Sequence, residues 1–182
     1  GEIAFTLHGS ARSILAAERT LLNFMQRMSG IATLTAELVG LLKGTKTQLL
    51  DTRKTTPGIR FMEKWAVRIG GGVNHRFALY DMIMLKDNHV DFSGGIAQAI
   101  QRTQEYLATT NKSLKVEIEV RNLDELDQVL AIGQVDRIML DNFSPALLKE
   151  AIDKINGRFE TEASGGIVKE TLRTYAETGV DY

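Results

Sequence analysis

The chain has 182 residues, 43% of them hydrophobic and 25% charged, which is the composition of an ordinary globular domain with a substantial core. A formal net charge of −1 gives no reason to expect a nucleic acid or an anionic membrane as a partner. The absence of cysteine excludes disulfides, thiolate metal sites and a cysteine nucleophile, and no apolar run approaches the ~20 residues of a membrane span. With no signal peptide at the start, a cytoplasmic protein is expected.

The N-terminal part of the chain predicts a short strand followed by two helices. Gly1–Leu7 has the composition of a strand. Apolar residues recur at helical spacing over residues 11–28, with Ser10 as N-cap and Ser29-Gly30 as the stop. A second helix is expected over residues 31–42.

From residue 47 onward, strand-like and helix-like segments alternate. Strands are predicted at Thr47–Leu50, Met82–Leu85, Lys115–Val120, Arg137–Leu140 and Arg158–Glu162, with the start of another at Val180–Tyr182. The helices predicted between them cover residues 59–68 and 96–107, a segment capped by Asn122, Ser144-Pro145 to residue 155, and residues 168–177. Repeated units of this kind give a parallel sheet, either closed into a barrel or open and doubly wound.

The barrel is favoured over the doubly wound sheet. Consecutive strand ends all carry polar residues, whereas a doubly wound sheet concentrates its site at one switch point. An eight-stranded barrel needs about 250 residues, which is more than this chain has. The expected fold class is therefore α/β, an incomplete TIM-like barrel of parallel strands that is open and truncated at both ends.

Polar residues at the strand ends predict one pocket, because the carboxyl ends of parallel strands meet at one edge. Positive charge is supplied by Arg53, Lys54, His75, Arg76 and Lys86, and negative charge by Glu119 and Asp141. Ser164, Gly165 and Gly166 offer backbone N–H groups at the start of a helix, which is a typical anion site. Such a pocket suits a substrate that carries both phosphates and hydroxyls.

Each of these features also has a structural interpretation. Arg53 and Lys54 could be solvated loop charges, the triple glycine before Asn74 could only mark a turn, and Asp141-Asn142 could cap a helix. Glu117 and Glu119 lie on one face of a strand, so both face the barrel interior or both face outward.

The three histidines give no sign of a metal site. His8 and His89 are expected to be structural or surface residues. No HExxH or paired-histidine spacing exists, so a tight metal site built from protein ligands alone is not expected.

Seven motifs occur in an order that closely resembles the quinolinate phosphoribosyltransferase family. They are ARSILAAERTLLNFMQRMSGIAT, DTRKTTPG, GGGVNHR, LKDNH, EIEV, LDNF and EASGG, and together they extend over nearly the whole chain. Enzymes of this family convert quinolinate and phosphoribosyl pyrophosphate, with Mg²⁺, into nicotinate mononucleotide, pyrophosphate and CO₂ in NAD biosynthesis. The resemblance implies an N-terminal α/β sandwich domain, an incomplete barrel of six to seven strands, and a homodimer or hexamer.

The resemblance also implies a role for each matching residue. Arg53, His75 and Arg76 would bind the quinolinate carboxylates, joined by Arg19 from the neighbouring subunit. Lys54 and Lys86 would lie near carboxylates and phosphates, with Thr52 beside them as a further substrate contact, and Ser164, Gly165 and Gly166 would hold the 5′-phosphate. Glu119 and Asp141 would face the ribose hydroxyls and the magnesium shell, through water or substrate, and would act with Lys86 in catalysis.

By this resemblance, residues 1–9 would be a residual strand of the sandwich domain, and residues 10–182 the catalytic barrel without its last strand. Two alternatives remain open. One is a related type II phosphoribosyltransferase acting on nicotinate or another ring acid. The other is a barrel fragment without catalytic activity that serves in binding or assembly.

Overall fold

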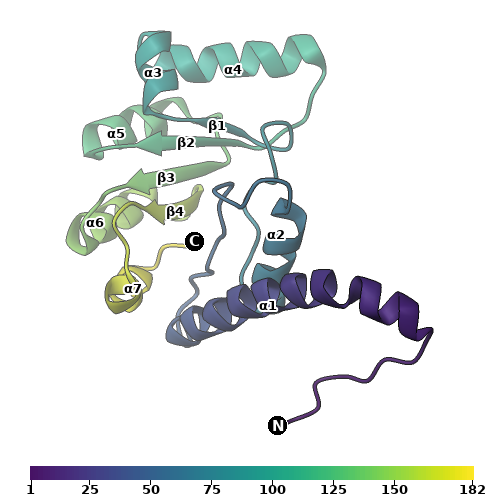
Figure 1. Cartoon of the computed structure of the whole chain (residues 1–182). Helices are drawn as coiled ribbons and strands as arrows, with labels where there is room; N and C mark the ends of the chain where they lie inside the picture. The colour runs from purple at the N-terminus through teal and green to yellow at the C-terminus, as the bar shows by residue number, and fades with distance from the viewer.

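The computed structural model describes all 182 residues and contains a four-stranded parallel sheet in the order β1-β2-β3-β4. The strands are β1 (Ile83–Leu85), β2 (Val116–Val120), β3 (Arg137–Asp141) and β4 (Glu160–Ser164). The helices that follow them are α3 (Asp87–Ser93), α4 (Ile96–Thr110), α5 (Leu123–Ile132), α6 (Pro145–Ile155) and α7 (Lys169–Ala176). Figure 1 shows helices α3 to α6 stacked along one side of this sheet.

Beyond β4, single hydrogen-bonded rungs continue the wall of the barrel. In each of these backbone hydrogen bonds the N–H of the first residue donates to the carbonyl oxygen of the second. The pairs are Tyr182 and Thr161 (3.0 Å), Ala163 and Tyr182 (3.0 Å), Gln48 and Asp181 (2.9 Å), Val73 and Leu49 (2.8 Å), and Asp51 and Val73 (3.1 Å). Residues 180–182, 48–51 and 73 therefore extend the four-stranded sheet in that order. The predicted incomplete α/β barrel is confirmed, although residues 47–50 contribute only an isolated parallel bridge instead of a strand.

The two faces of the sheet have opposite character. Outward side chains such as Val116, Ile118, Ile138 and Leu140 are almost fully buried beneath α3 to α6 and form the hydrophobic core. The inward side chains are mostly charged, and adjacent strands place Glu117 beside Arg137. The hydrophobic effect therefore holds the outer layer together, while the barrel interior is left to polar contacts.

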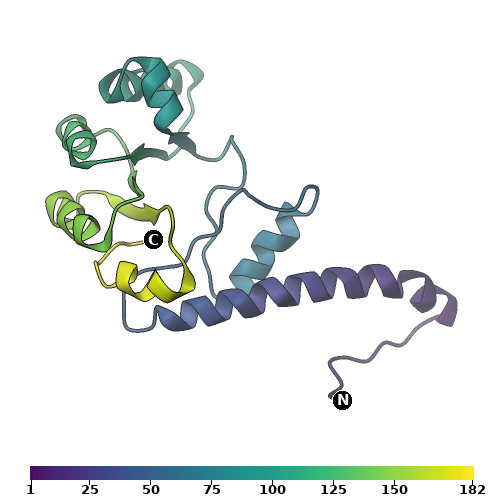
Figure 2. The same ribbon diagram turned by 60° about the vertical axis from the view of Figure 1, so that its left-hand side comes forward.

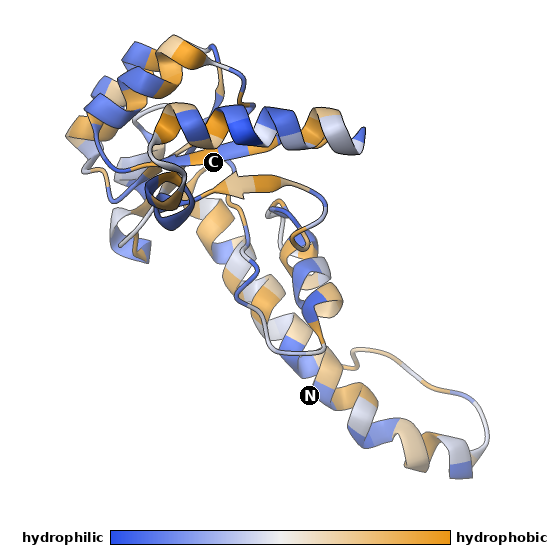
Figure 3. Ribbon diagram, turned by 90° about the horizontal axis from the view of Figure 1, so that it is seen from above, coloured by the Kyte–Doolittle hydropathy of each residue, from blue (hydrophilic) through white to orange (hydrophobic).

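Helix α1 (Ala11–Leu41) is one continuous helix, so the predicted break at Ser29-Gly30 is wrong. A glycine in mid-helix costs only about 1 kcal/mol, and Gly30 lacks the left-handed conformation that ends helices. The N-terminal half of α1 projects past the rest of the molecule (Figures 2 and 3). No helix combines the length and apolar character needed to cross a membrane.

Helix α2 (Arg60–Ile69) packs on α1 at the triple glycine. A Cβ atom at Gly70 would overlap the backbone of Ala32 and the side chain of Thr35, so the two helices approach more closely than any side chain allows. The triple glycine is therefore a packing feature as well as a turn.

Three further expectations differ from the structure. Residues 1–7 form no strand and are exposed, because no neighbouring strand offers them hydrogen bonds. Helix α3 begins directly after Lys86, where no helix is predicted, and β4 begins two residues later than predicted. The domain boundary at residue 9 stays a prediction.

Candidate active site

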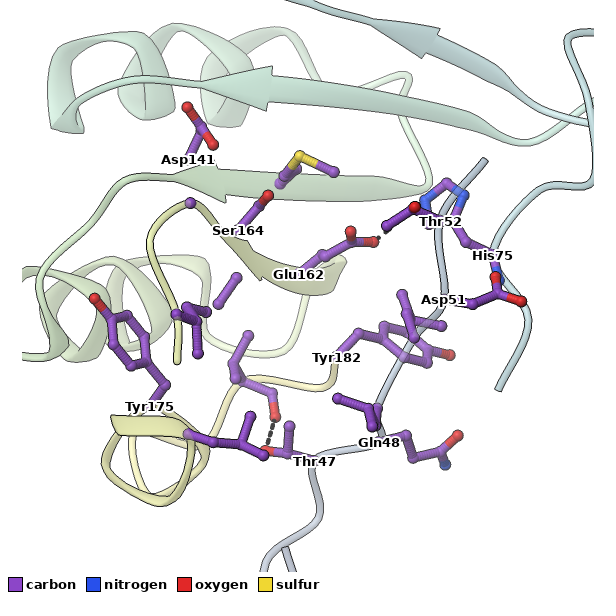
Figure 4. A pocket seen from close by; sticks show the side chains of 18 of the residues that line it. Thr47, Gln48, Asp51, Thr52, His75, Asp141, Glu162, Ser164, Tyr175 and Tyr182 are labelled. Carbon is purple, nitrogen blue, oxygen red and sulfur yellow. Dashed lines mark hydrogen bonds and ion pairs between the residues drawn. The ribbon is translucent and has the colours of Figure 1, made fainter. Parts of the chain in front are cut away.

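A cavity of about 800 Å³ opens at the carboxyl ends of the strands. Figure 4 shows side chains from several elements pointing into it. All but one of the site residues predicted from the sequence line this cavity: Thr52, Arg53, Lys54, His75, Arg76, Lys86, Glu119, Asp141, Ser164, Gly165 and Gly166. The exception is Arg19, which is exposed on the projecting part of α1. The structure thus confirms that these strand ends converge, while the role of each residue stays a prediction.

Two arginines that line the cavity, Arg53 and Arg76, form no salt bridge. The Nε atom of Arg53 is buried and has no hydrogen-bond partner. Arg76 donates to the carbonyl of Met82 at 3.1 Å, and its pKa is lowered by burial and by the charge of Arg53. A buried donor without an acceptor is unfavourable, and so are two neighbouring guanidinium groups. An anionic ligand would relieve both costs.

A buried loop network positions these arginines. The carboxylate of Asp51 pairs with Lys64 of α2, and both side chains are almost completely buried. The same carboxylate accepts from the Asn74 side chain (2.6 Å) and from the His75 backbone N–H (2.9 Å). Asp51 therefore ties the segment before Arg53 to the segment before Arg76.

The turn after Lys54 is held in a similar way. Glu63 of α2 accepts from the backbone N–H of Thr56 (3.0 Å), from its hydroxyl (2.8 Å) and from Arg27 of α1 (2.9 Å). Although burial opposes it, these hydrogen bonds lower the pKa of Glu63, so the carboxylate stays ionised.

His75, which directly precedes Arg76 in the chain, lies between the carboxyl groups of Glu117 and Glu162. Its Nε2 is 2.8 Å from Glu117 of β2 and 3.3 Å from Glu162 of β4. In the neutral ring, Nδ1 accepts from the Arg76 backbone N–H at 2.7 Å and the Nε2 proton faces the glutamates. Arg137 of β3 completes this group at 3.1 Å from Glu162.

The pKa values of this cluster are coupled. Burial lowers the pKa of His75, but the hydrogen bonds and charges of Glu117 and Glu162 outweigh burial and raise it to about 9. Burial raises the pKa of Glu117, whereas His75 and Arg137 hold the pKa of Glu162 below its ordinary value despite burial. The pKa of each of these groups therefore depends on the charge of the other two.

At the end of β1, Lys86 donates to Glu119 at 3.1 Å. The backbone N–H of Lys86 donates to Nδ1 of His89 at 3.0 Å, which confirms the structural role expected for His89. Glu119 and its neighbour Glu117 both face the barrel interior, so the question left open by their alternation is settled in favour of the inside.

Asp141 lies beside the glycine loop. Its carboxylate accepts from the side chain of Asn142 at 2.6 Å, and the Asn142 backbone N–H donates to the carbonyl of Ser164 at 2.7 Å. Gly165 has φ +93°, and a Cβ there would overlap Asn142. Glycine is therefore required at this position for the close approach of the two strand ends.

Carboxylates in the cavity are ligands of the kind that Mg²⁺ binds. Mg²⁺ prefers oxygen ligands and is commonly bound by one or two carboxylates together with substrate phosphates. Glu119 and Asp141 offer such oxygens from adjacent strands on the cavity wall. His75, Glu117 and Glu162 also lie close enough to hold an ion, but Arg137 already supplies their positive charge.

Sequence reasoning missed the residues that support the site from below. The sequence indicates only which way Glu117 faces. It gives no sign that four further residues belong to the site: Asp51, Lys64, Arg137 and Glu162. Strand alternation could have found Glu162, since it is two residues before Ser164 on the same face. The Asp51–Lys64 pair joins a strand end to a helix interior, for which the sequence carries no local signal.

The fold and the cavity together define a class: an α/β barrel protein whose cavity at the strand ends is lined by both cationic and acidic side chains. Residues 31–182 match the family model described as "Quinolinate phosphoribosyl transferase, C-terminal domain". The chain therefore belongs to the quinolinate phosphoribosyltransferase family, as its motifs indicate.

Individual relatives agree with this assignment. The chain is 47% identical to a chloroplastic nicotinate-nucleotide pyrophosphorylase [carboxylating] of Arabidopsis thaliana, over 96% of this chain and 53% of that protein. It is 43% identical to a probable nicotinate-nucleotide pyrophosphorylase [carboxylating] of Bacillus subtilis, over 100% of this chain and 62% of the relative. The crystal structure of NadC from Streptococcus pyogenes is similar, with a TM-score of 0.88 and 45% identity over 96% of this chain and 60% of that one. The chain thus spans little more than half the length of these relatives.

Proposed function

We propose that this protein transfers the phosphoribosyl group of phosphoribosyl pyrophosphate to quinolinate, with loss of CO₂, to give nicotinate mononucleotide and pyrophosphate in NAD biosynthesis. The observation that carries the proposal is that Arg53 and Arg76, one of them with a buried unpartnered donor, line the same cavity as the carboxylates of Glu119 and Asp141. Quinolinate is a planar dianion, which suits the bidentate donor geometry of guanidinium groups.

In this proposal the cavity has two half-sites. Arg53 and Arg76 bind the ring dicarboxylate, while Ser164, Gly165 and Gly166 offer backbone donors to a phosphate. Glu119 and Asp141 face the ribose, where departure of pyrophosphate creates an oxocarbenium-like transition state that negative charge stabilises. Lys54 and Lys86 neutralise the phosphates and carboxylates that these half-sites bring together.

Magnesium is part of the same proposal. Glu119 and Asp141 would hold Mg²⁺ indirectly, through water or substrate oxygens, in keeping with their position on the cavity wall. When bound, the ion would neutralise charge on pyrophosphate as it leaves.

The proposal extends to assembly and location. Arg19 lies outside the cavity on the exposed, projecting part of α1, a position that suits donation to the cavity of a second copy. A homodimer or hexamer with Arg19 shared across the interface is therefore proposed. A cytoplasmic location is also proposed, and cell fractionation with an antibody to this protein would test it.

Two matched variants test the half-sites. Arg53→Lys keeps the charge but loses the fork of donors, so quinolinate binding should weaken about tenfold to a hundredfold while phosphoribosyl pyrophosphate binding changes little. Asp141→Asn should spare quinolinate binding and lower turnover, because its charge matters most in the transition state.

The measurements are titrations of each ligand and steady-state turnover on the purified protein. Nicotinate serves as the control ligand, since it has one carboxylate instead of two. Tighter binding of nicotinate than of quinolinate by the unmodified protein would contradict the proposed substrate, and equal weakening of both substrates by both variants would contradict two separate half-sites.

A further inference from the structure

Both ring nitrogens of His75 already have partners inside the protein. Nε2 faces Glu117 at 2.8 Å and Glu162 at 3.3 Å, while Nδ1 accepts from the Arg76 backbone N–H at 2.7 Å. The side chain is only 7% exposed. A histidine that bound a substrate carboxylate would need a free ring N–H directed into the cavity, and none remains here.

The carboxylates that hold His75 are themselves held in the barrel interior. Arg137 pairs with Glu162 at 3.1 Å and with Glu160 at 2.8 Å, and its guanidinium group stacks 4.1 Å from the Tyr182 ring centroid. Moving His75 toward a ligand would break these buried contacts, because the atoms around them are close-packed.

Glu117 differs from the other members of this network because it cannot touch a ligand. It is completely buried, it does not line the cavity, and one of its oxygens has no hydrogen-bond partner. Its carboxyl group lies 2.8 Å from Nε2 of His75 and also interacts with the carboxyl group of Glu162. A carboxylate that is fully buried with one oxygen unpartnered lowers the stability of the protein. Its contribution to the site is therefore the position that it gives to His75.

We propose that Glu117 and Glu162 are positioning residues that hold the imidazole of His75, and that His75 in turn fixes the backbone of Arg76 at the cavity wall instead of binding substrate itself. The network thereby sets where the Arg76 guanidinium group points, together with the Met82 carbonyl that accepts from it. This inference rests on the proposed function for the identity of the ligand, but not for the arrangement of His75.

A double-mutant cycle tests the inference. His75→Gln, Glu117→Gln and the double variant are compared for quinolinate KM, phosphoribosyl pyrophosphate KM and kcat. Each single variant should raise the quinolinate KM about tenfold with little change in kcat, and the double variant should be no worse than either single one, because both changes break the same chain of contacts. Multiplicative effects of the two substitutions would overturn the inference.

Glu160→Gln is the matched control. It removes a salt bridge of Arg137 but no contact of His75, so the quinolinate KM should stay near the unmodified value. If Glu117→Gln does not fold, Glu162→Gln takes its place in the cycle, since Glu162 contacts the same nitrogen.

Nitrogen NMR of the His75 ring separates this inference from the proposed function. In the ligand-free protein, Glu117→Gln should shift the Nε2 resonance, and an unchanged resonance would overturn the arrangement whatever the substrate is. Addition of quinolinate to the unmodified protein should leave both ring resonances in place while binding is detected by calorimetry. A change in the ring nitrogen chemical shifts on addition of quinolinate would make His75 a ligand-binding residue and would overturn the inference. If quinolinate does not bind at all, the result counts against the proposed function alone.

Discussion

The buried imidazole of His75 makes the stability of this protein depend on pH in a predictable direction. Its pKa is about 9 in the folded protein, against an ordinary value of 6.5, because Glu117 and Glu162 favour the protonated form more than burial disfavours it. Arg137 is the other charged group of this cluster. A raised pKa means that the folded state binds the proton more tightly than the unfolded state. The stabilisation is therefore complete below pH 6.5 and is lost as the pH rises through about 9.

Denaturant unfolding of the unmodified protein and of His75→Gln measures this effect. The difference in unfolding free energy between them should be largest at about pH 6.5 and below, and should shrink as the pH rises toward about 10. A difference that grows with pH over this range would contradict the assignment.

Gly165 gives a second prediction for a single residue. In Gly165→Ala the new Cβ must displace Asn142, whose side chain donates to Asp141, so both stability and turnover should fall. We expect a loss of about 1–3 kcal/mol in unfolding free energy. Gly166→Ala is the control, because Gly166 also has positive φ but a Cβ there meets no neighbour. Equal losses of stability and turnover in the two variants would show that backbone strain alone is responsible.

The residues at the cavity surface could be predicted from the sequence, but those beneath it could not. Arg53, Lys86 and Asp141 each follow an apolar run, which places them at strand ends. Arg137 is the first residue of β3, and its partner Glu162 lies in the middle of β4. Their contact depends on the register between β3 and β4, which no local pattern specifies.

At the scale of elements, the approach of α1 to the triple glycine predicts opposite effects for two glycines. Gly70→Ala should destabilise the protein by about 1–3 kcal/mol, because the methyl group overlaps Ala32 and Thr35 of α1. Gly30→Ala should stabilise it by about 0.5–1 kcal/mol, because Gly30 lies within the helix with no neighbour near a Cβ. Thermal unfolding of both variants checks the signs. A stabilising Gly70→Ala would mean that the helices are not in close contact there.

Two of the three predicted N-caps form their hydrogen bond, whereas Ser10 precedes α1 without one. The side chain of Asn122 accepts from the Glu125 N–H and that of Ser144 from the Leu147 N–H, each at the helix start predicted from the sequence. Errors arose where tertiary contacts decide the outcome. Two segments with strand-like composition, residues 47–50 and 180–182, form only isolated backbone hydrogen bonds with the chain beside them instead of regular strand ladders. Helix α3 was missed because its seven residues are too few to show a periodic pattern.

At the scale of the whole molecule, the proposed sharing of Arg19 predicts complementation between two inactive variants. Arg19→Ala and Arg53→Ala would each impair every site of a homodimer. A mixed dimer of the two has one site that carries both defects and one that carries neither. After unfolding and refolding together, about a quarter of the unmodified activity should return, since about half of the dimers are mixed. Sedimentation and activity assays check this, and no recovery in a mixture of verified dimers would exclude the shared site.

The rungs that join residues 47–51 to residues 180–182 have a consequence for how the molecule folds. The Thr47 hydroxyl and the carbonyl that accepts from it, on Val180, are 133 positions apart, whereas β2, β3 and β4 each pair with a strand that precedes them closely in sequence. Contacts of large sequence separation form slowly, because the entropy of closing the intervening loop is lost before the contact gives anything in return. The sheet and its outer helices can therefore assemble before the cavity exists. Refolding molecules should regain their secondary structure first and their capacity to bind a ligand last.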